Sequence, residues 1–289
     1  MLFLLTFMFM YSQSCLNNDV NMIVNTHYSA LSSSEKSEIC NKIEDTYKSI
    51  GDSCFTARKN IVNYCFDSIL YRDVHNSSKV SKFLLYNIRI NEIDTLQEEK
   101  VLELCESGYS NWSFIELVGL IGKQKFIKPL KQLKLMRELN NFEANTVDNT
   151  LVILGDVRII NSKVNKINKL VEGKYKYLDS DFYTEIYKIL LYDRKEFCEL
   201  LLDLVENDNG KLVNIGDYGD GDILYCSLST VSLEILTKII KGFSKVNVTC
   251  FEGCVNEKVR TTVKEWRKNN NNYDLIKWHP YYGANYLYW

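Results

Sequence analysis

Two stretches of the chain, LIGKQKFI at residues 120–127 and ILGDVRII at residues 153–160, decide the fold that this sequence encodes. They align at an offset of 33 residues, and each contains an apolar helix end, a glycine, a polar turn and an apolar pair. A glycine at this place can take the left-handed conformation that ends a helix. The stretches therefore predict two copies of one helix–turn–helix connection.

Helical periodicity extends along most of the chain, in short segments with brief connections. Three segments open with the capping-box patterns Ser32-x-x-Glu35, Thr95-x-x-Glu98 and Ser113-x-x-Glu116. The chain has 13 glycines and 2 prolines, fewer turn residues than all-β folds need. We predict helices over residues 32–50, 53–73, 78–89, 95–107, 113–121, 126–139, 146–154, 161–171, 180–192, 194–205, 230–242 and 256–268, with a Gly/Asp-rich connection over 207–229.

Residues 256–263, NEKVRTTV, continue to Trp266 and resemble the first helix of HEAT-like repeats. Residues 120–133, LIGKQKFIKPLKQL, resemble the turn between the two helices of such a repeat. The resemblance implies an all-α fold in which antiparallel helix pairs stack as a short HEAT-like α-solenoid. It also implies a surface for binding or scaffolding, and it transfers no catalytic residue.

The first fifteen residues, MLFLLTFMFMYSQSC, have the apolar core and small-residue cleavage region of an export signal, although no Lys or Arg precedes the core. We expect an exported protein that is periplasmic, in the cell envelope or secreted, with the signal over 1–14, a helical repeat domain over 15–268 and an aromatic tail over 269–289. The alternative for the N-terminus is a buried strand or helix. Cys15 is a candidate for lipidation, although Ser12 stands where a lipobox has Leu.

The formal net charge of −2 gives the chain no overall positive field that would attract nucleic acid. No second apolar run reaches the length of a bilayer-spanning helix, so membrane association is expected only through an N-terminal lipid anchor. The partner expected for a repeat fold is another protein.

Nine cysteines favour an oxidising compartment, with buried free thiols as the alternative. Cys40 and Cys65 lie at nearly equal distances from the turn at 51–53, so an antiparallel helix hairpin would place them side by side. This predicts a Cys40–Cys65 disulfide. A local disulfide between Cys250 and Cys254 is also expected, because their three-residue spacer does not fit a zinc site.

The best candidate for a metal site is the acidic segment 216–222, in which Asp217, Asp220 and Asp222 supply carboxylates on a bendable loop. Such a loop suits Ca²⁺, although the EF-hand spacing is absent. The alternative is a flexible acidic turn between helices, without a cofactor.

No set of residues forms a recognisable catalytic motif, so no catalytic residue is predicted. The leading hypothesis is a binding or scaffold module for another macromolecule. The alternative is an exported hydrolase that uses a metal ion bound at 217–222. For the aromatic tail we expect packing over the last helix pair, with an exposed binding patch as the alternative.

Overall fold

The computed structural model describes residues 18–51, 54–70, 77–136, 138–207, 210–218, 222–243 and 255–276. They form two compact units, an N-terminal unit up to Leu154 and a C-terminal unit from Gly155. The sequence places one helical domain over residues 15–268, whereas the contacts divide this range at residue 155. The predicted export signal, residues 1–14, lies outside the described residues.

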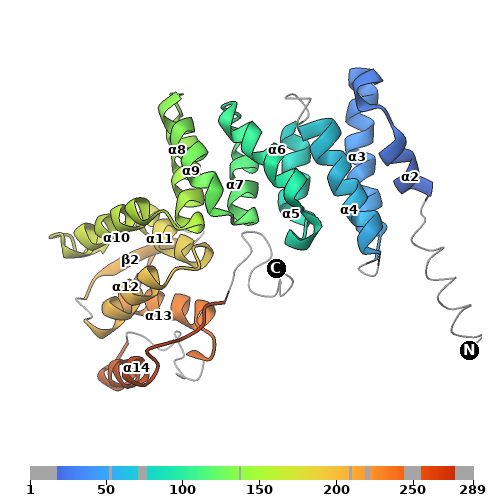
Figure 1. Cartoon of the computed structure of the whole chain (residues 1–289). Coiled ribbons are helices and arrows are strands. Elements are labelled where there is room, and N and C mark those ends of the chain that lie inside the picture. The colour runs from blue at the N-terminus through green and yellow to red at the C-terminus, as the bar shows by residue number, and fades with distance from the viewer. Residues whose placement is uncertain are drawn as a thin grey trace, which may run out of the picture. The chain divides into compact units, whose positions relative to one another are not determined.

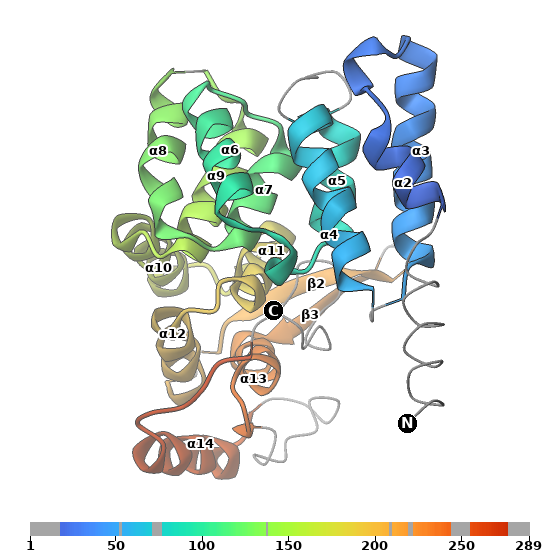
Figure 2. The same ribbon diagram turned by 45° about the vertical axis from the view of Figure 1, so that its right-hand side comes forward.

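The N-terminal unit is a row of short helices that lie side by side (Figure 1 and Figure 2). Its elements are α2 (Asn18–Asn25), η1 (Tyr28–Ala30), α3 (Ser33–Ser49), α4 (Phe55–Tyr64), the π-helical η2 (Cys65–Leu70), α5 (Ser77–Asn87), η3 (Ile90–Glu92), α6 (Thr95–Glu106), α7 (Trp112–Ile121), η4 (Gln124–Phe126), α8 (Ile127–Met136) and α9 (Asn141–Leu154).

The helices of this unit pack against their next-but-one neighbours. Helix α5 contacts α7 and α7 contacts α9, while α2 contacts α4 and α6 contacts α8. Every second helix therefore belongs to the same layer, as in a stack of helix pairs. The predicted fold class, an all-α chain of stacked antiparallel helix pairs, is confirmed.

The predicted turn repeat is confirmed at both of its copies. Gly122, which follows α7, has a φ of 72°, and Gly155, which follows α9, has a φ of 90°. Both values lie in the left-handed region that glycine adopts without strain. After Gly155, Asp156 accepts hydrogen bonds from the backbone N–H groups of Arg158 and Ile159 and so caps the next helix.

A buried charge cluster joins α3, α4 and η3. The Arg58 Nε donates to Glu92 Oε1 at 2.7 Å, and the Tyr47 hydroxyl donates to Glu92 Oε2. The Arg58 guanidinium also lies over the Tyr47 ring, 4.2 Å from its centroid. All three side chains are buried, so the cluster is part of the core between the first helix pairs.

The C-terminal unit combines helices with a small sheet (Figure 1). Its elements are α10 (Val157–Glu172), β1 (Tyr177–Leu178), α11 (Ser180–Tyr187), η5 (Lys188–Leu191), α12 (Lys195–Glu206), β2 (Leu212–Tyr218), β3 (Asp222–Ser227), α13 (Leu228–Ile239) and α14 (Glu257–Asn269). In the sheet, β2 lies between β1, which is parallel to it, and β3, which is antiparallel.

The sheet corrects the prediction of an irregular connection over residues 207–229. Strands β2 and β3 form a hairpin, with a register irregularity between Asn214 and Gly216. Leu178 and Val213 are buried and face α11, which packs against β2. Gly and Asp residues at the tip do not exclude strands, because apolar and aromatic residues flank the tip on both sides.

Helix α14 is joined to α12 by one arginine. Arg267 forms ion pairs with Glu199 at 2.5 Å, Asp203 at 2.8 Å and Glu206 at 3.2 Å. In the segment predicted as a tail, Tyr273 is buried and its hydroxyl donates to Glu199 Oε1 at 2.8 Å. The described part of the tail therefore packs on this helix pair, and residues 277–289 lie outside the described residues. Among the helices that the structure describes, none is long and apolar enough to cross a membrane.

Candidate functional site

The structure changes the setting of the predicted metal site. Asp217 lies in β2 and Asp222 begins β3, where Asp217 is paired with Ile223 and Asp222 with Tyr218. Asp220 lies outside the described residues. Within the described ranges, no group of three His, Cys, Asp or Glu side chains could hold a metal ion. Ca²⁺ binding at Asp217, Asp220 and Asp222 therefore stays a prediction.

The predicted Cys40–Cys65 disulfide is not present in the structure, where both residues are buried and neither takes part in a disulfide. They do lie near each other: burial raises the pKa of the Cys65 thiol, and the neighbouring Cys40 raises it further. Axes of packed helices are about 8–10 Å apart. A disulfide needs Cα atoms within about 4.4–6.8 Å, which only residues at the closest approach reach. The two cysteines are therefore neighbours, as predicted, without a bond between them in this structure.

One described cysteine takes part in a disulfide. Cys54, which precedes α4, is disulfide-bonded, and the sequence analysis did not single it out. Cys15, Cys250 and Cys254 lie outside the described residues, so the lipidation site and the Cys250–Cys254 disulfide stay predictions.

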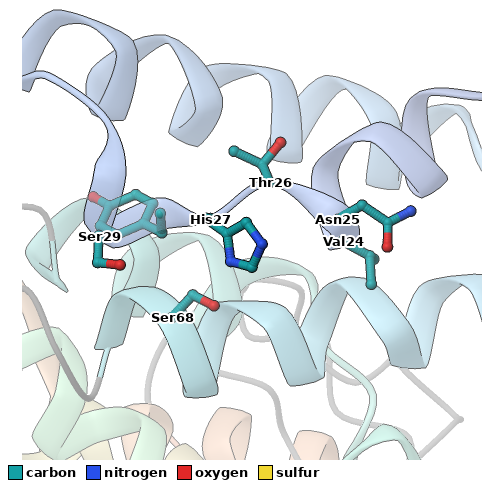
Figure 3. Close-up of a pocket in the computed structure, with 7 residues that line it drawn as sticks. Val24, Asn25, Thr26, His27, Ser29 and Ser68 are labelled. Atoms are coloured by element: carbon teal, nitrogen blue, oxygen red, sulfur yellow. The ribbon is translucent and has the colours of Figure 1, made fainter.

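A pocket of about 250 Å³ opens in the N-terminal unit between the α2–η1 connection and the π-helical segment η2. Figure 3 shows the His27 ring directed toward the segment that carries Ser68. The pocket is lined by Val24, Asn25, Thr26, His27, Tyr28, Ser29 and Ser68.

The side chains that line this pocket are suited to polar contacts with a small ligand. An imidazole, an amide and several hydroxyl groups can bind a small polar group by hydrogen bonds. The described residues that line the pocket include no carboxylate to orient His27 as a base for a serine nucleophile. The π-helical turn beside it is a feature often found at functional sites. The pocket alone supports no reaction.

A stronger candidate is a partly exposed row of side chains on three helices of one layer. The Lys82 ammonium of α5 lies 5.2 Å from the Trp112 ring centroid of α7. The Trp112 ring in turn contacts the Phe142 ring of α9 edge-on, with centroids 6.4 Å apart. These three residues are spaced by 30 positions along the chain. They therefore form a ladder across successive helix pairs.

Two further exposed apolar side chains, at the end of α8, lie close to Phe142 in the sequence. Leu135 and Met136, the last residues of α8, are 86% and 55% exposed, and Phe142 is 61% exposed. Scattered single exposures are ordinary, but grouped ones mark interaction sites. We call Lys82, Trp112, Leu135, Met136 and Phe142 the Trp112 patch.

The Trp112 patch was not predicted from the sequence, although one signal for it was present. A search for large residues at the spacing of the helix pairs would have aligned Trp112 with Phe142. The 33-residue offset of the turns hides this alignment, because α9 has 14 residues and α7 has 10, so the turn after α9 lies farther from Phe142 than the turn after α7 lies from Trp112.

Comparison of the chain with protein-family models, with curated proteins and with solved structures gives no match. The class of protein is therefore defined by its own fold and surfaces. It is a helical protein whose N-terminal unit is a two-layer stack of helix pairs.

Proposed function

We propose that this chain is an exported helical-repeat protein that acts as a binding or scaffold module for another protein. The observation that carries the proposal is the Trp112 patch, which extends over several helices of the stack. Helix pairs in such stacks contact only their neighbours, so their outer surfaces are available for recognition.

The composition of the patch favours a protein ligand. Trp, Phe and Met are enriched where proteins bind one another, and a few large anchors carry most of the binding energy. The Lys82 ammonium beside Trp112 would attract a carboxylate of the partner. The partner segment expected here presents an apolar side chain next to an acidic one.

Crosslinking in the native host tests the proposal. A photoreactive residue placed at Phe142 is expected to capture a protein of defined mass. The same residue placed at Glu103, which is exposed on α6, is the matched control. Capture at both positions, or at neither, would contradict the proposal.

A second variant separates loss of binding from loss of fold. Leu135→Ser combined with Phe142→Ser removes exposed apolar surface and is expected to leave the helical circular dichroism signal unchanged. The proposal requires that this variant also lose the crosslinked species formed from a photoreactive residue at Met136. Retention of that species would show that the patch does not bind the partner.

Export is the second part of the proposal, supported by the apolar leader and by the disulfide-bonded Cys54. Mass spectrometry of the native protein is expected to show an N-terminus near Ser14 or Cys15. An intact Met1 in a soluble cytoplasmic fraction would overturn this part and leave the binding proposal to its own tests.

A further inference from the structure

One face of the sheet in the C-terminal unit is open to solvent. Side chains alternate between the two faces of a strand, so Tyr177 points away from the side that buries Leu178. The Tyr177 ring contacts the Tyr225 ring of β3 edge-on, with centroids 5.0 Å apart. Ile223, two residues before Tyr225, shares its face. Tyr177, Ile223 and Tyr225 are 55%, 50% and 40% exposed.

The loop before β1 adds lysines and another tyrosine to this surface. In the sequence Lys174-Tyr175-Lys176, Tyr175 is 80% exposed and both lysines are exposed. The Lys176 ammonium lies 5.8 Å from the Tyr177 ring centroid. The buried Lys211 donates hydrogen bonds to the carbonyl oxygens of Gly173 and Tyr175. The loop is therefore held in place, and its exposed side chains stand on a fixed support.

Helix α10 extends the positive charge. Arg158, Lys166 and Lys169 are exposed and lie along one stripe of this helix. Together with Lys174 and Lys176 they make five exposed cations, none of which lies within ion-pair distance of a carboxylate among the described residues, although Lys166 is close enough to Glu185 to lower the pKa of that carboxyl. The whole segment from 157 to 176 contains a single acidic residue. Its charge is therefore available to an anionic partner.

We propose that this surface docks the protein on an anionic lipid bilayer. The docking surface consists of Lys174, Tyr175, Lys176, Tyr177, Ile223 and Tyr225, and α10 with its exposed cations precedes it in the chain. Lysines would contact anionic headgroups, and each contributes to binding at a negative surface. Tyrosines partition to the level of the headgroups, with the ring in the apolar part and the hydroxyl in water.

The exposed aliphatic side chains favour a lipid bilayer over a nucleic acid as the anionic partner. Ile223 is 50% exposed, and Leu170 at the end of α10 is 44% exposed. Such aliphatic side chains offer little to a single-stranded nucleic acid, whose bases stack on aromatic faces. The edge-on contact of Tyr177 with Tyr225 forms no parallel stacking platform. A bilayer accepts both kinds of side chain, because it has charge at its surface and hydrocarbon below.

Sedimentation of the full chain with vesicles tests the proposal. Binding is expected to vesicles that contain phosphatidylglycerol, to weaken with added salt, and to be weak on phosphatidylcholine alone. Lys174→Ala and Lys176→Ala are each expected to lower the partition coefficient about fivefold, from about 1 kcal/mol for each lysine near a negative surface. Tyr175→Ser is expected to lower it on the same vesicles without changing the salt dependence.

The matched control is Lys258→Ala combined with Lys268→Ala, which removes two exposed lysines of α14 in the same unit. This variant has the same net charge as the Lys174→Ala, Lys176→Ala pair and is expected to bind vesicles like the wild type. Equal losses in both pairs would overturn the proposed surface. Absence of vesicle binding, with binding of a single-stranded oligonucleotide or of heparin instead, would overturn the lipid as the partner.

Fluorescence quenching tests whether the side chain at position 175 inserts into the bilayer. Tyr175→Trp is expected to give tryptophan emission that is quenched by lipids brominated in the acyl chains, beyond the quenching seen in the wild-type chain. Absence of additional quenching would show that no side chain enters the bilayer here. The proposal involves the C-terminal unit and the protein partner involves the N-terminal unit, so their variants and failures are distinguishable.

Discussion

Replacing Glu92 by leucine is expected to destabilise the N-terminal unit severely, because Glu92 is the anion of the buried charge cluster. Its side chain is 1% exposed and that of Arg58 is 8% exposed. Besides Arg58 and Tyr47, Glu92 Oε2 accepts a hydrogen bond from the Arg89 backbone N–H at 3.1 Å. The variant removes all three acceptor contacts and leaves the guanidinium in the core without its carboxylate.

The magnitude follows from this burial. Breaking a buried ion pair by removal of one partner costs about 3–5 kcal/mol. That is a large part of the roughly 5–15 kcal/mol by which a typical domain is stable. Replacing both charged residues, with Arg58→Met and Glu92→Leu together, is expected to recover most of the loss, because apolar side chains of similar size can fill the same space.

Urea denaturation measures these changes, and hydrogen exchange of peptides from α3 and α4 assigns them to the N-terminal unit. The matched control is Glu44→Gln, which breaks the Lys48–Glu44 ion pair, whose side chains are 57% and 46% exposed. Exposed pairs contribute about 0–1 kcal/mol, so this variant should remain near the wild type.

Two outcomes would contradict a buried, charge-paired Glu92. A loss for Glu92→Leu no larger than that for Glu44→Gln would show that the cluster is solvated. A double variant as unstable as Glu92→Leu alone would show that packing, rather than the loss of the Arg58–Glu92 ion pair, causes the destabilisation.

Two other predictions concern glycines and thiols. Gly155→Ala is expected to lower the Tm more than Gly122→Ala in scanning calorimetry. Both residues have a positive φ, but a Cβ at residue 155 would also lie 3.0 Å from a guanidinium nitrogen of Arg194. Equal losses of Tm would contradict this. Iodoacetamide at about pH 8 is expected to modify the partly exposed Cys226 before Cys105 and Cys198, because burial raises the pKa of each of these two thiols to about 12 and keeps them protonated. Peptide mass spectrometry gives the rates, and fast labelling of the two buried thiols would contradict their placement.

Helix starts show how far local sequence determines structure here. The Ser32 capping box is formed, with Ser32 Oγ accepting from the Glu35 backbone N–H at 3.4 Å and Glu35 Oε2 accepting from the Ser32 backbone N–H at 2.8 Å. The pattern at Thr95 is displaced by one residue, because the preceding Asp94 is the N-cap. Asn111 likewise caps α7 two residues before the predicted start. Several residues that can cap stand close together, and the pattern alone does not rank them.

The missed sheet has a different cause. Residues 212–215 and 223–226 are rich in apolar and aromatic residues, as strands are, but each run is short. Such a run becomes a strand only when a neighbour pairs with it. The pairing of Tyr177 with Leu212 joins residues 35 positions apart, which no local pattern encodes. The open face of the sheet could not be predicted for the same reason.

Net charge is a property of the whole chain, whereas a partner responds to charges within a screening length of about 8–10 Å. A formal net charge of −2 is therefore compatible with local segments in which lysine and arginine are paired and others in which they are in excess. In α14, Arg267 forms ion pairs with three carboxylates and Arg260 pairs with Glu257. The charges of these two arginines are therefore used in ion pairs within the protein. Residues 157–176 contain six Lys and Arg against one Glu. One of the six, Lys163, pairs with Glu185. The net charge of the whole chain therefore says nothing against an anionic partner at this segment. A negatively charged surface would bind at its exposed cations.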